Sequence, residues 1–493
     1  MAISSTLSRN NDAVLPWCVT TIVGALSYWV LVTNGTLDFT GWERFGLAYN
    51  SYLVNLLDGR LSVDPETIRL EGFYDGETAY MYFGVLPALL RLPFLPFVDF
   101  DTTYLARMIV FIFSAATAGL CHAISIIFIR RSTDVFDLEL RSSWYWVTGL
   151  LCWGSSATVI LISSASVYHE PLAVGLFLAI LYLFVVMRFW RGRNQSNQLV
   201  LMTLALIAGL SVHARPTIAI GLYLATVGLA FALWMARCRG QSSFKVVMTN
   251  ALLIGTPPAL ILLFFGVLLL WMNFARWGDP FVMAPLDHYG VVLQVEGVSP
   301  RIEAMIEDGR FNLLRIPANL LAHLLGGYQS WHETLTDFFN LGVVRLEQPT
   351  IGIVMLFVPF LFLAVRGVGC LRRFWVIDDA TALPLFLVGA AYVVTTSLIL
   401  AYATVTYRYK VEIWPLLFFL SLFGLVDIVQ SKSRTKTKQD IIYIILCSLV
   451  SMYFLLNAYF SCQSSELFAG QGSKVLVRNE FFRSILIVNF DAE

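Results

Sequence analysis

The sequence predicts an all-α membrane protein that crosses the bilayer many times, and three observations support this fold class. Of its 493 residues, 58% are hydrophobic and only 13% are charged, whereas about 25% of the residues in a soluble domain are charged. The apolar residues are gathered in runs of about 20, the length that a helix needs to cross roughly 30 Å of hydrocarbon. Charged residues, prolines and glycines separate these runs. This pattern excludes a soluble enzyme.

The apolar runs define about 11 transmembrane helices, in a single transmembrane domain that covers residues 1–493. Segment 199–236 counts as two short spans because Arg215 and Pro216 interrupt it, and proline opens a helix more readily than it continues one. The predicted spans are 14–33, 104–129, 144–162, 170–188, 199–213, 216–236, 246–271, 350–366, 382–400, 411–428 and 440–460.

Charge placement predicts which side of the membrane each connection faces. If the N-terminus is cytoplasmic, every short inner connection contains lysine or arginine, as the positive-inside rule requires. Most acidic residues then lie outside, in the long segments 34–103 and 272–349 and in a short extracytoplasmic tail, 461–493. The inner connections are too short to build a site, so we expect the functional site on the extracytoplasmic side.

The first outer segment, 34–103, contains two stretches that fit helices at the membrane surface. In 43–57, aromatic and apolar residues recur at helical spacing, which predicts an amphipathic helix in the interface. In 83–97, three prolines and Arg91 argue against a complete span, so we expect an interfacial or re-entrant segment. The loop between the two stretches is a candidate platform for a site.

Three acidic residues, Glu71, Asp75 and Glu77, lie in this loop beside aromatic residues that include Tyr82. A group transfer to a hydroxyl needs a base that accepts the proton, and a carboxylate can serve. Glu71 is favoured because it lies on the apolar side of the turn. The alternative is a solvated acidic turn around Asp75 and Gly76, which needs no function.

The turn Tyr168-His169-Glu170-Pro171 is a second candidate, because the chain re-enters the membrane here on the outer side. Ionisable residues at membrane depth are functional candidates. We therefore expect Glu170 to be a further candidate base, with Tyr168 and His169 in contact with the substrate. The alternative is that Glu170 stabilises the N-terminus of the helix that Pro171 opens.

Four basic residues lie at the outer ends of spans, against the positive-inside preference. They are Arg215, Arg276, Arg408 and Lys410, and the last two follow Tyr407. Such charges call for an anion, either from a ligand or from a protein carboxylate. A lipid phosphate fits this depth, and we expect Tyr407 to contact the same substrate. The alternatives are snorkelling to lipid head groups and pairing with Glu412.

Other partners are not indicated. The six histidines lack the spacing of a metal site, and the seven cysteines are scattered singly with no CxxC, which argues against zinc and against a disulfide framework. Lys plus Arg and Asp plus Glu both number 33, so no basic excess favours nucleic acid. We expect no metal, no cofactor and no nucleic-acid partner, while membrane lipids surround the apolar outer wall.

The pattern as a whole resembles the GT-C superfamily of membrane glycosyltransferases, which use polyprenyl-phosphate sugars. The number of spans, the acidic first outer segment and the outer arginines carry this resemblance over most of the chain. More locally, segment 68–93, from Ile68-Arg-Leu-Glu71 to Arg91-Leu-Pro93, is similar to bacterial, often actinobacterial, GT-C-like membrane proteins. The shorter motifs Val167-Tyr-His-Glu170, Ala214-Arg-Pro216, Asn273-Phe-Ala-Arg276 and Arg408-Tyr are similar to the same proteins.

This resemblance implies a reaction and roles for particular residues. In the family, an acidic residue of the first outer loop is the catalytic base, and basic residues near the membrane surface hold the donor phosphate. Carried onto this sequence, Glu71 or Asp75 is the base, and Arg215, Arg276 and Arg408 are donor-phosphate residues. The sequence departs from the family in one respect, because many members have paired acidic residues shortly after the first helix and here only Asp38 and Glu43 are near it.

The resulting expectation is a glycosyltransferase of the bacterial inner membrane. It moves a sugar from a polyprenyl-phosphate donor to a glycan or lipid acceptor of the cell envelope, with inversion and without a metal. A polymerase or ligase of lipid-linked glycans is a close alternative, because it uses similar outer loops and a related donor. A lipid or solute transporter is a further alternative, but it would place acidic residues or broken helices near the bilayer midplane, and Asp427 is the nearest case.

Overall fold

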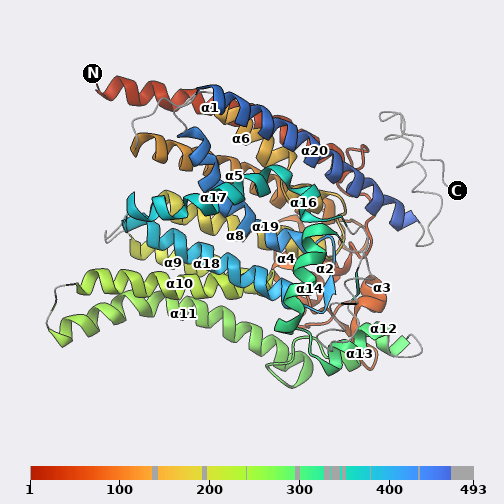
Figure 1. Ribbon diagram of the computed structural model, residues 1–493. Helices are drawn as coiled ribbons and strands as arrows, with labels where there is room; N and C mark the ends of the chain where they lie inside the picture. The colour runs from red at the N-terminus through yellow and green to blue at the C-terminus, as the bar shows by residue number, and fades with distance from the viewer. Residues whose placement is uncertain are drawn as a thin grey trace.

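The computed structural model describes residues 2–135, 143–190, 197–239, 241, 243–294, 300–326, 334, 345–346, 351–377, 379–430 and 434–467. Most of the predicted tail, 461–493, and parts of the second outer segment lie outside these residues. Long helices run side by side as a bundle, and shorter helices gather at one end of it (Figure 1).

Eight helices in the described part of the chain are long and apolar enough to cross a membrane. Each coincides with a predicted span, which confirms the all-α polytopic fold class. They are α1 (Ala2–Val32), α5 (Ala106–Val135), α8 (His169–Phe189), α10 (Pro216–Cys238), α11 (Phe244–Trp277), α18 (Asp379–Ala401), α19 (Lys410–Val429) and α20 (Arg434–Leu467).

The predicted number of 11 spans is not confirmed, because the other three predicted spans correspond to shorter helices. Segment 199–213 lies in α9 (Asn197–Val212), and 350–366 is covered by α16 (Ile353–Leu356) and part of α17 (Val358–Ile377). Segment 144–162 is divided into α6 (Ser143–Gly154) and α7 (Thr158–Ile162). The division falls at Ser155 and Ser156, whose hydroxyls hydrogen-bond to the Ser448 carbonyl of α20, at 3.4 Å, and to the Thr158 hydroxyl. A hydropathy pattern does not register such contacts.

Two helices, α8 and α19, form the centre of the bundle. In each of them, 72% of the most apolar 18-residue stretch is buried inside the protein, compared with 17% in α1 and α11. Figure 1 shows α1 and α20 along one edge of the bundle and α10 and α11 along the other. The peripheral helices therefore present apolar surface to lipid, while α8 and α19 are held by protein on most sides.

The central helix α19 packs closely on α17. A Cβ atom added at Gly424 would lie 1.9 Å from the Leu363 carbonyl oxygen, and one at Gly367 would lie 2.0 Å from the Leu420 carbonyl oxygen. Small residues allow such close approach between helices in membranes. Arg366 of α17 forms an ion pair of 2.9 Å with Asp427, which lies near the C-terminal end of α19. It also forms an ion pair of 3.2 Å with Asp440 of α20.

The first outer segment folds into short elements that pack on one another. Within predicted stretch 43–57 a helix begins at Ala48, and its Tyr49, Tyr52 and Leu53 are buried in a protein core. Stretch 83–97 forms only single turns. The elements are α2 (Ala48–Leu57), α3 (Pro65–Ile68), η1 (Arg69–Glu71), β1 (Phe73–Asp75), β2 (Thr78–Tyr80), α4 (Leu86–Leu89) and η2 (Leu92–Phe94).

The second outer segment begins after α11 and lies at the same end of the bundle (Figure 1). Its described elements are η3 (Leu286–His288), α12 (Gly290–Gln294), α13 (Pro300–Glu307), η4 (Leu313–Arg315), α14 (Ile316–Leu325) and β3 (Arg345–Leu346). Strand β3 pairs in parallel with β4 (Thr404–Val405), which follows α18. The second outer segment therefore contacts the connection that leads to Arg408.

Candidate functional site

Glu71 ends the single turn η1, and its side chain is partly buried. One of its carboxylate oxygens accepts a hydrogen bond from the hydroxyl of Tyr289, at 3.0 Å. Tyr289 belongs to the second outer segment, so the two long outer segments meet at this carboxylate.

Backbone contacts hold the two segments together around Glu71. The Gly290 amide donates to the Gly72 carbonyl at 2.8 Å, and the ring of Tyr289 stacks on Phe73 with centroids 5.1 Å apart. His288 Nδ1 donates to the Tyr74 carbonyl at 2.6 Å. Together these contacts form a clasp, which we define as residues 286–290 docked on residues 71–74.

Asp75 and Glu77 lie away from this contact. They flank the tip of the β1–β2 hairpin, where Gly76 adopts a φ of +60°, and both side chains are exposed. Glycine adopts this left-handed conformation without steric cost. The geometry matches the solvated-turn interpretation of Asp75, whereas Glu71 occupies the sheltered end of the same loop.

Tyr168 connects Glu71 to Arg408. Burial raises the pKa of Tyr168 well above its ordinary range, and the Glu71 carboxylate raises it further through its charge and a hydrogen bond. The Arg408 guanidinium lies over the ring of Tyr168, 4.4 Å from its centre. A carboxylate and a cation that are separated by more than 300 residues in the sequence thus contact the same phenol.

Tyr82 belongs to the same group. Burial raises its pKa well above the ordinary range, and the neighbouring phenols of Tyr409 and Tyr402 and the charge of Glu71 act in the same direction. The structure therefore brings together four of the predicted site residues, Glu71, Tyr82, Tyr168 and Arg408.

Arg215 lies at the edge of this group, at the N-terminus of α10. Its guanidinium is 5.3 Å from the centre of the Tyr409 ring and forms an ion pair of 2.5 Å with Glu412, whose side chain is fully buried. Thr217 donates a hydrogen bond to the other Glu412 oxygen. The pairing with Glu412 that the sequence offered as an alternative is therefore present for Arg215.

Arg276 and Lys410 are both buried. Arg276 donates to the carbonyl oxygens of Met81, at 2.6 Å, and of Met272, at 3.1 Å, and so ties α11 to the first outer segment. The Lys410 ammonium lies 5.6 Å from the centre of the Tyr407 ring. Both predicted phosphate residues thus contact protein groups.

Glu170 and His169 are buried at the start of α8. Glu170 forms a fully buried ion pair with Arg91 at 2.6 Å, and Arg91 also donates to the Asn50 side chain at 2.8 Å. His169 Nδ1 lies 2.9 Å from the Ser166 hydroxyl. The Glu170–Arg91 pair joins the first outer segment to the turn that carries Tyr168.

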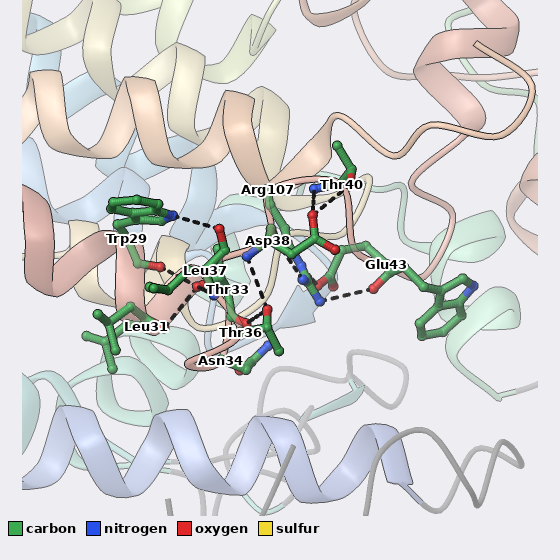
Figure 2. Close-up of polar contacts among 12 residues, drawn as sticks. Trp29, Leu31, Thr33, Asn34, Thr36, Leu37, Asp38, Thr40, Glu43 and Arg107 are labelled. Carbon is green, nitrogen blue, oxygen red and sulfur yellow. Dashed lines mark hydrogen bonds and ion pairs between the residues drawn. The ribbon is translucent and has the colours of Figure 1, made fainter. Parts of the chain in front are cut away.

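The two acidic residues after the first helix are arranged around Arg107, as Figure 2 shows. Arg107 forms an ion pair with buried Glu43 at 2.7 Å and donates to the Asp38 carbonyl at 2.9 Å. The Asp38 side chain is exposed and accepts from the Thr40 amide and hydroxyl. The Thr40 hydroxyl is the main cause of the lowered pKa of Asp38, which is therefore ionised at neutral pH.

Comparison with solved structures finds the oligosaccharyltransferase of the archaeon Archaeoglobus fulgidus. Its apo form matches with a TM-score of 0.50 over 94% of this chain and 59% of that chain, at 12% sequence identity. The form tethered to an acceptor peptide that contains the NVT sequon matches with a TM-score of 0.51 over 90% of this chain and 55% of that chain, also at 12% identity. This chain therefore shares the fold of that protein over most of its own length.

The likeness is one of fold. This chain spans less than two thirds of the length of the oligosaccharyltransferase, and neither protein-family models nor curated protein sequences match it. In this fold the long outer segments lie at one end of the helix bundle, where Glu71, Tyr168 and Arg408 meet.

One solved form of the archaeal protein is a complex with zinc and sulfate. In the part of this chain that the structure describes, no group of three or more His, Cys, Asp or Glu residues is placed to hold a metal ion. The residues around Glu71 are mainly tyrosines and arginines, which do not form a divalent-metal site.

Several residues of the site were not predicted from the sequence, namely Tyr289, Arg310, Tyr402 and Tyr409. Tyr289, Arg310 and Tyr402 lie in outer connections with no motif or periodic pattern, whereas Tyr409 is the tyrosine of the Arg408-Tyr motif but was not itself named as a site residue. One feature of the sequence could have indicated Arg310 as a site residue, because it is a basic residue in a segment predicted to be outside. However, it lies in Glu307-Asp-Gly-Arg310, a composition typical of a solvated turn.

Proposed function

We propose that this chain is a glycosyltransferase of the bacterial inner membrane that moves a sugar from a polyprenyl-phosphate donor to a hydroxyl group of a cell-envelope glycan or lipid. The N-terminus is cytoplasmic, and the reaction takes place on the extracytoplasmic side. The observation that carries the proposal is the contact of Tyr168 with both Glu71 and Arg408, which brings a base and an anion-binding cation together.

In the proposed reaction, Glu71 accepts the proton of the acceptor hydroxyl as its oxygen attacks the anomeric carbon. The bond from that carbon to the donor phosphate breaks, and its electron pair remains on the phosphate. Attack opposite the leaving group inverts the anomeric configuration. Arg408 stabilises the phosphate, since a fixed cation in a site sheltered from water lowers the energy of a developing anion.

The other predicted residues have supporting roles in this proposal. Arg215, Arg276 and Lys410 add positive potential at the phosphate, although protein groups already contact each of them. Tyr82, Tyr168, His169 and Tyr407 contribute to the walls that receive the sugar and the phosphate. The Arg91–Glu170 pair holds the Tyr168 turn in place, so Glu170 acts on the structure of the site rather than on the proton.

Transfer of a lipid-linked oligosaccharide is a second candidate function. It is favoured by the likeness of fold to an oligosaccharyltransferase. It differs from the first candidate in the size of the transferred group and uses the same base and cation.

A transfer assay with purified protein in lipid nanodiscs tests the proposal. It uses a panel of radiolabelled polyprenyl-phosphate monosaccharides and polyprenyl-linked oligosaccharides with a membrane-glycan acceptor extract, with and without EDTA. We expect transfer by the wild type to fall by about 10²-fold or more in Glu71→Gln, which removes the base, and strongly in Arg408→Ala. Glu66→Gln, an exposed acid of the same loop, is the matched control.

Three results would contradict the proposal. Transfer that survives in Glu71→Gln but is lost in Asp75→Asn would move the base to Asp75. Transfer by the wild type that EDTA abolishes would refute the metal-independent mechanism. Intact wild-type protein that transfers no sugar from any donor, while moving a labelled lipid across the bilayer, would identify a transporter.

A further inference from the structure

Arg310 lies in the second outer segment, between α13 and η4. It follows Gly309, which adopts a φ of +77°. This left-handed glycine reverses the chain after α13 and directs it toward the end of α18.

Hydrogen bonds fix the backbone on both sides of Arg310. Its carbonyl accepts from the Ala403 amide at 2.9 Å, and the Asn312 amide donates to the Ala401 carbonyl at 2.8 Å. Phe311 forms a β-bridge with Tyr402, and their rings are 5.2 Å apart. Residues 310–312 are thus paired with the connection that follows α18.

Two further side chains, Arg315 and Asn319, donate hydrogen bonds to the backbone around this pairing. Fully buried Arg315 donates to the carbonyl oxygens of Gly309, at 2.6 Å, and of Ala304, at 3.2 Å. Asn319 donates to the carbonyl oxygens of Leu400, at 2.8 Å, and of Tyr402, at 2.9 Å. The position of Arg310 relative to Tyr402 is therefore set before any ligand binds.

The Arg310 side chain is partly buried, and the neighbouring groups that affect its pKa are the phenols of two tyrosines. Burial lowers its pKa, and Tyr402 and Tyr82 oppose this effect. Among the residues that the structure describes, no carboxylate pairs with it. Three other arginines near the outer end of the bundle do have carboxylate partners, in the pairs Arg91–Glu170, Arg107–Glu43 and Arg215–Glu412.

A partly dehydrated cation without a counter-charge is unfavourable, and an anion relieves this cost. One guanidinium group can donate two parallel hydrogen bonds to two oxygens of the same phosphate, because the spacing of its N–H groups matches that of the oxygens. Two aromatic residues far from Arg310 in the sequence connect it to the site. Tyr402 packs edge-on against Tyr409, with ring centroids 5.6 Å apart. The Arg408 guanidinium lies 5.7 Å from the centre of the Tyr409 ring. Tyr82 is common to Arg310 and to the group around Glu71.

We propose that Arg310 is a further anion-binding residue and that, together with Arg408, it binds phosphate oxygens of the lipid-linked donor. This inference rests on the proposed function, because it assigns a ligand to the same site. An anionic phospholipid head group has the same phosphate chemistry, and the experiment below separates the two sources.

The test measures equilibrium binding of radiolabelled polyprenyl monophosphate to the full chain in zwitterionic-lipid nanodiscs. We expect Arg310→Ala to weaken binding by about tenfold or more, since a hydrogen bond to a charged group is worth roughly that factor. Arg310→Lys should recover part of the loss. Arg60→Ala removes an exposed arginine whose partner is Asp58 and should bind like the wild type. The temperature of unfolding of each variant shows whether it is folded.

The outcomes separate this inference from the proposed function. If the wild type binds no polyprenyl phosphate, the proposed function fails. If the wild type and folded Arg310→Ala bind it equally, the role of Arg310 is refuted and the proposed function stands. If phosphatidylglycerol in the nanodisc displaces the probe from the wild type but not from Arg310→Ala, the residue binds head groups, and the donor assignment is overturned.

Discussion

The hydroxyl of Tyr289 donates a hydrogen bond to the carboxylate of Glu71, and these residues come from the two different outer segments. Tyr168 contacts the same carboxylate from a third connection. The carboxylate is therefore contacted by two phenols. The second outer segment is therefore part of the site proposed here.

Replacing Tyr289 with phenylalanine should lower turnover by about tenfold and leave KM nearly unchanged. The ring would still stack on Phe73, but Glu71 would lose a hydrogen bond to a charged group, worth roughly 1.5–3 kcal/mol. Steady-state transfer kinetics would measure this. A rise in KM with unchanged kcat would contradict a role in orienting the base.

Replacing Gly290 with valine should detach the clasp. A Cβ atom at this position would lie 2.8 Å from the Leu70 carbonyl oxygen and 3.0 Å from the Tyr74 ring, so the segment must move away from Glu71. We expect a large loss of transfer and faster proteolysis within 286–294. Gly255→Ala in α11 has open space around its Cβ and is the control. Equal protease resistance in Gly290→Val and the wild type would refute the clasp.

Breaking the Arg91–Glu170 pair should destabilise the protein rather than change its chemistry. Removing one partner of a buried pair leaves an uncompensated charge and costs about 3–5 kcal/mol. We expect Arg91→Ala to lower the temperature of unfolding clearly, whereas Arg60→Ala, at an exposed pair, should change it little. If Glu170→Gln remained as stable as the wild type but lost transfer, Glu170 would be a base and not a structural residue.

Alkaline pH should weaken the fold through Tyr82 and Tyr168. Burial raises the pKa of both in the folded state, while an unfolded tyrosine loses its proton near pH 10. The folded state then binds more protons, so stability is constant below about pH 10 and falls as pH rises above it. Unfolding at increasing pH should show this decline, and Tyr168→Phe should reduce its slope. Ultraviolet absorbance of tyrosinate near pH 10 in the folded protein from these residues would contradict the prediction.

Hydropathy and charge were sufficient to predict the bundle, because a helix in lipid must bury its backbone polar groups regardless of its neighbours. The division at Ser155 and Ser156 was missed because the apolar run continues across it in the sequence. Glu71 and Arg408 were identified as separate candidates, but their common contact with Tyr168 depends on the packing of distant connections. Tyr289 was missed for the same reason, since a lone tyrosine in an irregular segment has no local signal.

The packing of α19 has a consequence for how the proposed donor would be selected. Its glycine contact with α17 and the ion pairs of Arg366 prevent the helix from sliding along its axis, and Arg408 lies two residues before its start. The cation is thus held at one fixed position relative to the helix bundle. For the proposed donor, we therefore expect selection for the phosphate and sugar that this cation faces, and tolerance of variation in the length of the isoprenoid tail.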